Sequence, residues 1–169
     1  ISKLDLLEVR WGKKRRFAHS YIGFGLTPVV AVELNRHTLN AIKELFLVVK
    51  TYWEYQPFTI ELDDTHLQLD SLVLANIPEM AKVLDLSEDG KPTDGKFEVI
   101  MVPHRHKLSM LTWALKSATI GLGKQPQATQ MSLKTLQKMP MQLDGEVVRL
   151  AAEADMRISI AHKAIKTLR

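Results

Sequence analysis

The chain has 169 residues, 46% of them hydrophobic, which excludes a disordered segment and indicates one domain with a sizeable core. It has no cysteine, which excludes disulfides, thiolate chemistry and cysteine-type zinc sites. The net charge of +4 suits an anionic partner, such as a phosphate or an acidic membrane surface, but is too small to indicate nucleic acid. No apolar run reaches the roughly 18–20 residues of a membrane-spanning helix.

The N-terminal residues predict a β-hairpin. Two strands are expected at 4–11 and 15–22, joined by a turn at 12–14, although the apolar–polar alternation of the first strand is imperfect. The glycines of 23–25 then interrupt the pattern, so we expect the second strand to end before them.

Two helices are predicted. Apolar side chains recur at helical spacing over 39–53, and this helix should end before Pro57 because the residue that precedes a proline disfavours helical backbone. The same spacing recurs over 108–118, and the glycines that follow at 121 and 123 suit a helix C-terminus.

The remaining segments alternate apolar and polar side chains or are short and continuously apolar, as strands are. Short connections join most of them, so the strands should run antiparallel. The expected strands lie at 58–62, 67–69, 72–75, 97–102, 131–133, 141–150 and 157–161. We therefore predict a single domain over 1–169, mainly β, with the architecture of an antiparallel two-layer β-sandwich with two α-helices.

Asp144-Gly145-Glu146 is the first candidate site. Two carboxylates flank a glycine that permits a tight turn, so both side chains can project from one loop held by strands. Such a pair suits a general base or a group that positions a metal ion. An ordinary Asp-Gly hairpin turn explains the same residues. The residues alone leave both interpretations open.

A second group of carboxylates, Asp85, Glu88, Asp89 and Asp94, crowds a polar segment. Carboxylates and free carbonyls on an irregular loop are the ligands of hard cations such as Mg²⁺. The spacing does not match an EF-hand loop, and a solvated turn is the alternative interpretation.

Two basic segments are candidate anion sites. Residues 13–16, Lys-Lys-Arg-Arg, either touch phospholipid head groups or form a solvated hairpin tip. Residues 104–107, His-Arg-His-Lys, lack a clear third ligand for a metal and better suit a helix N-terminus that faces solvent or a phosphate. No phosphate-binding loop, dinucleotide fingerprint or serine-hydrolase elbow occurs, so the sequence contains no complete nucleotide site.

Six short segments form a wider pattern through their order and spacing. They are Tyr21-Ile22-Gly23-Phe24-Gly25, the helix ending near Trp53, Leu74-Ala75-Asn76, Thr93-Asp94-Gly95-Lys96-Phe97-Glu98-Val99, the helix before Gly121, and Leu143-Asp144-Gly145-Glu146. Each is weakly specific alone. Together, over nearly the whole chain, they resemble the C-terminal domain of bacterial lipid kinases related to diacylglycerol kinase and sphingosine kinase.

The resemblance implies a two-domain enzyme that phosphorylates a lipid hydroxyl, such as that of diacylglycerol, with ATP and Mg²⁺. Its C-terminal β-sandwich would contribute the base and the lipid cleft. Glu146 would accept the proton of the hydroxyl, and Asp144 would assist or orient it. The Mg²⁺ site of the family would fall on Asp94, with the backbone carbonyls of Lys91 and Lys96.

The resemblance also implies partners and a location. ATP would be bound mainly by an N-terminal domain with a Gly-Gly-Asp-Gly loop, which this sequence lacks. Because the sequence begins at Ile1 without an initiator methionine, we expect a piece of a longer protein that is inactive alone. The expected partners are the lipid substrate, an anionic membrane surface and that N-terminal domain, with a homodimer left open and nucleic acid not expected. The expected location is cytoplasmic, peripheral at the inner membrane face.

The sequence departs from the family pattern after Asn76, where a glycine-rich stretch and a Pro-x-Ala are usual. Here 77–81 reads Ile-Pro-Glu-Met-Ala, and no glycine occurs before Gly90. Two other functions stay open. One is a non-catalytic lipid- or ligand-binding β-sandwich in which 144–146 is only a turn. The other is a structural domain whose apolar cleft holds a partner protein.

Overall fold

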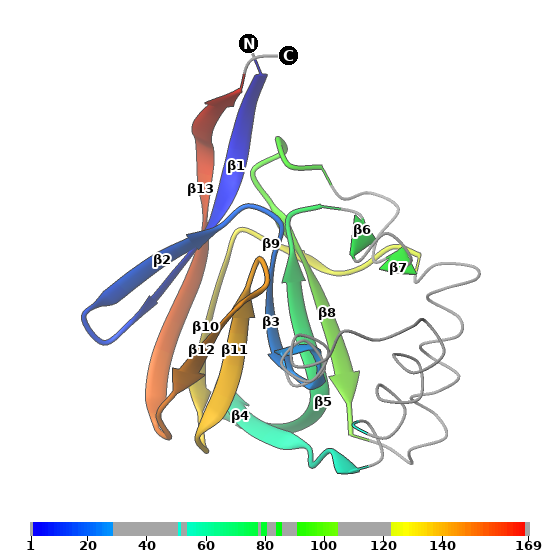
Figure 1. Ribbon diagram of the computed structural model, residues 1–169, viewed down its shortest axis with the longest axis vertical. Helices are drawn as coiled ribbons and strands as arrows, with labels where there is room; N and C mark the ends of the chain where they lie inside the picture. The colour runs from blue at the N-terminus through cyan, green and yellow to red at the C-terminus, as the bar shows by residue number, and fades with distance from the viewer. Residues whose placement is uncertain are drawn as a thin grey trace, which may run out of the picture.

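A computed structural model describes residues 2–28, 51, 54–77, 79–80, 84–85, 91–104 and 123–167, which form one open, curled antiparallel sheet and a small separate ribbon (Figure 1). The ribbon consists of β6 (Glu79–Met80) and β7 (Leu84–Asp85). The strands of the sheet are β1 (Ser2–Trp11), β2 (Lys14–Ala18), β3 (Tyr21–Gly25), β4 (Phe58–Leu62), β5 (Thr65–Ala75), β8 (Phe97–Pro103), β9 (Gln127–Ala128), β10 (Gln130–Thr135), β11 (Met139–Leu143), β12 (Glu146–Leu150) and β13 (Ala154–Thr167).

The order of the strands brings the two ends of the chain together. It runs β12-β11-β3-β5-β4-β10-β13-β1-β2, with β8 paired to β5 and β9. The first and last strands, β1 and β13, pair from Ser2 opposite Thr167 to Trp11 opposite Met156. The β1–β2 hairpin therefore forms one end of this order and projects from the rest of the sheet (Figure 1).

The continuous sheet differs from the predicted two-layer sandwich, and β5 is the reason. The first part of this 11-residue strand pairs with β4, and the second part pairs with β3 on one side and β8 on the other. Because one strand carries hydrogen bonds to all three neighbours, these four strands belong to one continuous sheet. Alternation along a strand reports which side chains face inward, but it does not report which strands share a ladder.

The predicted helices at 39–53 and 108–118 lie almost entirely outside the described residues. The predicted strand 15–22 is wrong in its bounds, because His19 and Ser20 separate β2 from β3. The glycines of 23–25 do not end a strand but belong to β3.

Packing explains the glycine at position 25. Its φ is +82°, and a Cβ there would lie 2.3 Å from the ring of Phe58. Glycine is required because the aromatic ring occupies the space of a side chain.

Buried side chains from both halves of the sheet pack into one apolar cluster. The largest fully buried ones are Leu7, Ile22, Phe24, Phe58, Ile60, Leu72, Leu74, Phe97, Ile100, Met141 and Ile158. Among the residues that the structure describes, no helix is long and apolar enough to cross a membrane.

The space at Gly25 predicts an unequal cost of two matched substitutions. Gly12 also has a positive φ, of 54°, but nothing lies within 4 Å of its missing Cβ. Gly12→Ala should therefore lower the free energy of unfolding only by the backbone penalty, about 1 kcal/mol. Gly25→Ala should lower the free energy of unfolding by about 3 kcal/mol or more, because the clash with Phe58 adds to that penalty. Urea unfolding measures both, and equal losses would contradict this account of the packing.

Candidate functional site

Asp144 and Gly145 form the turn of the β11–β12 hairpin. Leu143 and Glu146 pair across it, so the loop has two residues. Both loop residues have positive φ, 47° at Asp144 and 97° at Gly145, as a type I′ turn requires. The segment therefore forms an Asp-Gly hairpin turn, and this turn fixes where the neighbouring side chains lie.

The Asp144 carboxylate reaches from this turn to the corner between β2 and β3. It accepts the backbone N–H groups of His19 at 2.6 Å, Ser20 at 2.9 Å and Tyr21 at 3.1 Å. The ring of His19 donates to it from Nδ1 at 2.6 Å. In return, the N–H of Asp144 donates to the carbonyl of Tyr21 at 3.2 Å. The carboxylate thus anchors the hairpin to the corner.

These donors keep Asp144 ionised. Burial raises the pKa of its carboxyl, but the N–H groups of His19, Ser20 and Tyr21 and the His19 ring lower it by more, so the pKa lies below its ordinary value. Burial and the nearby Asp144 charge together raise the pKa of Tyr21. A carboxylate with four donors and a lowered pKa is a poor acceptor for a substrate proton.

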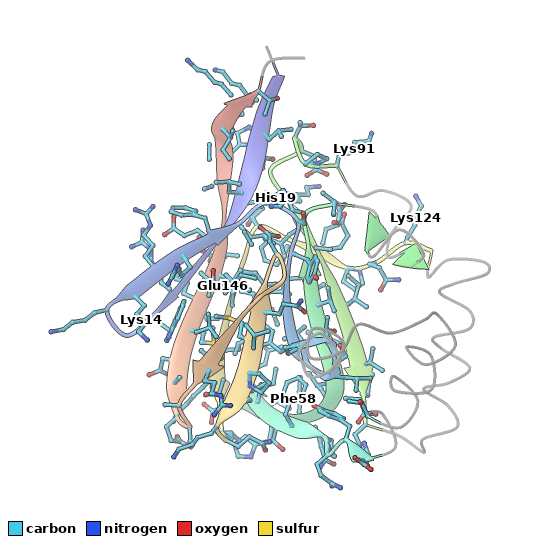
Figure 2. All side chains as sticks on the ribbon, viewed as in Figure 1. Lys14, His19, Phe58, Lys91, Lys124 and Glu146 are labelled. Atoms are coloured by element: carbon cyan, nitrogen blue, oxygen red, sulfur yellow. The ribbon has the colours of Figure 1, made fainter. Side chains whose placement is uncertain are left out.

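Glu146 offers a contrasting carboxylate two residues away. It is exposed at the start of β12, and within the described part of the chain it makes no hydrogen bond or ion pair. Together with residues of β2 and of the β11–β12 hairpin, it lines a pocket of about 230 Å³. Figure 2 labels Glu146. The pocket residues are Arg16, Phe17, Leu143, Asp144, Glu146 and Val148. The pocket combines two carboxylates and one guanidinium with three apolar side chains, and this mixture suits an amphipathic ligand with a hydroxyl group.

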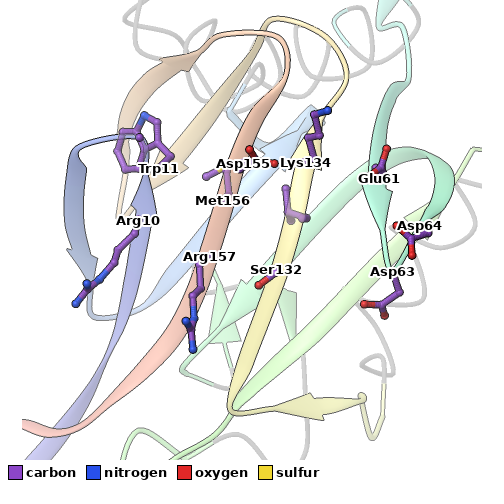
Figure 3. A pocket seen from close by; sticks show the side chains of 12 residues that line it. Arg10, Trp11, Glu61, Asp63, Asp64, Ser132, Lys134, Asp155, Met156 and Arg157 are labelled. Atoms are coloured by element: carbon purple, nitrogen blue, oxygen red, sulfur yellow. The ribbon is translucent and has the colours of Figure 1, made fainter.

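A larger hollow, of about 520 Å³, lies elsewhere on the sheet (Figure 3). Charges of both signs surround it, and they come from Arg10, Glu61, Asp63, Asp64, Lys134, Asp155 and Arg157. It contains none of the site residues predicted from the sequence. Its mixed charge favours no single class of ligand.

The predicted metal loop precedes β8. Asp94 Oδ1 accepts the N–H of Lys96 at 3.0 Å, and the N–H of Asp94 points to the carbonyl of Lys91 at 3.5 Å. Gly95 has a φ of +75°, which bends the chain between them. The loop therefore brings the Lys91 carbonyl close to the backbone of Asp94, whose carboxylate accepts a hydrogen bond from Lys96.

The wider acidic cluster is only partly visible. Asp85 lies in β7, whereas Glu88 and Asp89 fall outside the described residues. Over the described ranges, no three His, Cys, Asp or Glu side chains form a group that could hold a metal ion. A cation at this loop would depend on carbonyl ligands beside Asp94.

Asp5 is a central residue that the sequence did not single out. Its side chain is fully buried. It accepts the N–H of Gly95 at 2.7 Å and the N–H of Lys163 at 2.6 Å, and Nδ1 of His162 lies 2.9 Å from its Oδ1. The N–H of Asp5 donates to the carbonyl of Pro92. Asp5 thereby attaches the metal loop to β1 and β13, and its only sequence signal was the imperfect alternation of the first strand.

Asn76 connects Asp5 to the corner that Asp144 holds. Its amide Nδ2 donates to the carbonyl of Asp5 at 3.0 Å and to that of His19 at 2.9 Å. Its backbone N–H donates to the carbonyl of Ser20 at 2.7 Å. The two sites that the sequence predicted separately therefore belong to one hydrogen-bonded network.

The histidine pair of 104–107 is not seen as a unit, since His106 lies outside the described residues. His104 Nδ1 instead meets the buried carboxylate of Asp70 at 2.9 Å. Burial, and then the charge of Asp70, raise the pKa of Tyr55. The contact between His104 and Asp70 holds the end of β8 against β5.

The fold is that of known proteins, although no protein-family model and no curated protein sequence matches the chain. Three solved structures from Bacillus anthracis str. Sterne are similar, two provisionally assigned as diacylglycerol kinases and one described as such. Their TM-scores are 0.64, 0.61 and 0.61, each at 13% sequence identity and 96% coverage of this chain. The chain spans about half of theirs, 53%, 54% and 55%. The likeness confirms the resemblance at the level of fold.

The anchoring role of Asp144 predicts a pH-dependent loss of stability. Asp144→Asn removes a charged acceptor of four hydrogen bonds and should cost about 2 kcal/mol at pH 7. Because the folded pKa of Asp144 is lowered, its stabilisation is present above the ordinary aspartate pKa and is lost as the pH falls through the folded value. The difference between the two proteins should therefore shrink below about pH 4.

Urea unfolding from pH 7 to pH 3 measures this difference. Glu146→Gln is the matched control, because its carboxylate has no partner in the described structure and its loss should leave stability nearly unchanged. An Asp144→Asn protein as stable as the unmodified chain at pH 7 would contradict the anchor.

Proposed function

We propose that this chain is the lipid-binding and base-carrying half of an ATP-dependent lipid kinase, which phosphorylates a lipid hydroxyl such as that of diacylglycerol. The observation that carries the proposal is the exposed carboxylate of Glu146, which has no partner among the described residues. It lines a pocket of charged and apolar side chains and is held by a turn that Asp144 anchors. The likeness in fold to structures described as diacylglycerol kinases supports it.

In the proposed reaction, the lipid enters with its hydroxyl next to Glu146. Phe17, Leu143 and Val148 contact the apolar part of the lipid near the head group and exclude water there. The hydroxyl oxygen attacks the γ-phosphorus of ATP, the bond from that phosphorus to the β–γ bridging oxygen breaks, and ADP leaves. Glu146 accepts the hydroxyl proton. Phosphoryl transfer depends mostly on positioning and on a local proton acceptor.

Asp144 acts in this proposal as a positioning residue. Its four donors hold the turn, and through the turn the first residue of β12, in one place. The two neighbouring carboxylates thus have different tasks, because among the described residues only Asp144 accepts hydrogen bonds through its carboxylate.

Mg²⁺ is part of the proposal, at Asp94 with the carbonyls of Lys91 and Lys96. The donor set fits, since hard cations take carboxylate and carbonyl oxygens, and each oxygen engaged in one hydrogen bond keeps a second lone pair. When bound there, the ion would order the loop that Asp5 ties to the network. ATP would be bound mainly by the nucleotide-binding domain that we propose precedes this chain.

The metal proposal predicts binding that depends on one carboxylate. Mg²⁺ should bind weakly to the chain by calorimetry, and Asp94→Asn should abolish the signal. Asp64→Asn is the control, because Asp64 is an exposed acid in the β4–β5 turn outside this loop. No Mg²⁺ binding by the unmodified chain, or equal binding by Asp94→Asn, would remove the site.

The catalytic proposal predicts the effect of Glu146→Gln in an enzyme that contains both this chain and its nucleotide-binding domain. Glutamine keeps the shape but cannot accept the proton, so kcat should fall by about 10² to 10⁴ with the lipid KM nearly unchanged. Glu153→Gln, which removes a turn carboxylate paired with Lys134, should leave kcat unchanged. The isolated chain should neither hydrolyse ATP nor phosphorylate lipid.

Two outcomes would reject the catalytic assignment. Normal kcat in Glu146→Gln, together with its loss in Asp144→Asn, would reverse the roles of the two carboxylates. Normal kcat in both would leave the alternative of a non-catalytic lipid- or ligand-binding domain whose turn is structural.

A further inference from the structure

We propose that the β1–β2 hairpin binds the surface of an anionic lipid bilayer and thereby holds the Glu146 pocket at the membrane. The link to the pocket rests on the proposed function, whereas binding of the hairpin to lipid can be tested without catalysis.

The hairpin carries an excess of positive charge. Arg10, Lys13, Lys14, Arg15 and Arg16 lie within seven residues, and all five are exposed. The carboxylate of Glu8 pairs with only two of them, Arg10 and Arg15. Among the described residues, the other three have no carboxylate partner. This unbalanced charge attracts an anionic surface, over a distance of about 8 Å at physiological ionic strength.

An exposed aromatic side chain accompanies these cations. Phe17 is 44% exposed, and the guanidinium of Arg15 lies 4.8 Å from the centre of its ring. Lys14 lies 5.8 Å from the ring centre of Trp11. Aromatic rings beside basic groups suit the bilayer interface, where the ring enters the acyl boundary and the cations reach the phosphates.

The shape of the hairpin suits a broad surface. β2 ends the strand order, and among the described strands its one partner is β1. The hairpin projects from the sheet, with Lys14 at its outer end (Figure 2). A bilayer can therefore contact it with little obstruction from the other described strands.

The pocket favours lipid over nucleic acid as the occupant. Arg16 and Phe17 of the hairpin also line the Glu146 pocket, together with the apolar Leu143 and Val148. A carboxylate beside the basic residues repels a continuous phosphodiester backbone, and apolar walls suit an acyl chain. Hairpin contact with a membrane would place the pocket mouth where lipid hydroxyls lie.

Sedimentation with vesicles tests the proposal. The chain should bind vesicles of phosphatidylcholine with phosphatidylglycerol, and bind pure phosphatidylcholine far more weakly. K13Q/K14Q/R16Q should lower affinity on the order of 100-fold, since each basic residue near an anionic surface contributes roughly fivefold. The control K3Q/K138Q/K166Q removes three exposed lysines outside residues 7–18, the part of the hairpin in which β1 and β2 pair, and its affinity should fall less than about threefold. Phe17→Ser should weaken binding without reducing its salt dependence.

Circular dichroism confirms that each variant is folded. Equal losses in the hairpin and control variants, no preference for anionic vesicles, or tighter binding to a DNA oligonucleotide than to vesicles would overturn the proposal. Glu146→Gln should bind vesicles normally. Failure of the kinase assignment would appear in kcat of that variant, whereas failure of the membrane proposal would appear in the vesicle and DNA binding measurements and not in kcat.

Discussion

The buried carboxylate of Asp5 is the constraint on which the rest of this structure depends. A buried charge is tolerated only where polar groups replace water, and Asp5 accepts two backbone N–H groups and has Nδ1 of His162 at 2.9 Å. It lies where the pairing of β1 with β13 shifts register, and it accepts the N–H of Lys163, whose φ of +54° removes it from a regular ladder. One carboxylate thus holds together an irregular strand pair and the loop that precedes β8.

The same network explains why the Asp144 carboxylate accepts four hydrogen bonds while the Glu146 carboxylate has no partner among the described residues. From Asp5, hydrogen bonds continue through Asn76 to the corner at His19 and Ser20, and Asp144 closes the path from the other side. The position of Glu146 is therefore set by the hydrogen bonds of Asp144 and Asn76 and not by contacts of its own side chain. A rigid support under a free side chain is the arrangement that a proton acceptor needs.

The sequence predicted what depends on neighbours in the chain and missed what depends on distant ones. Strand 58–62 and the Asp-Gly turn follow from alternation and turn chemistry, and the structure has both. The contacts of Asp5 join residues 90 and 158 positions apart, and no local pattern reports them. The continuity of the sheet through β5 was missed for the same reason. The proton-accepting role of Glu146 stays a prediction.

The pairing of β1 with β13 has a consequence for synthesis of the chain. β2 can pair with β1 as soon as both have been synthesised. β13 begins only at Ala154, so the other edge of β1 stays unpaired until then. At about 5–20 residues per second, that wait lasts roughly 7–30 s on the ribosome. Unpaired strand edges attract the same edge on other chains, and clustered positive charges oppose such pairing. The basic hairpin is thus suited to keep neighbouring nascent chains apart until the last strand arrives.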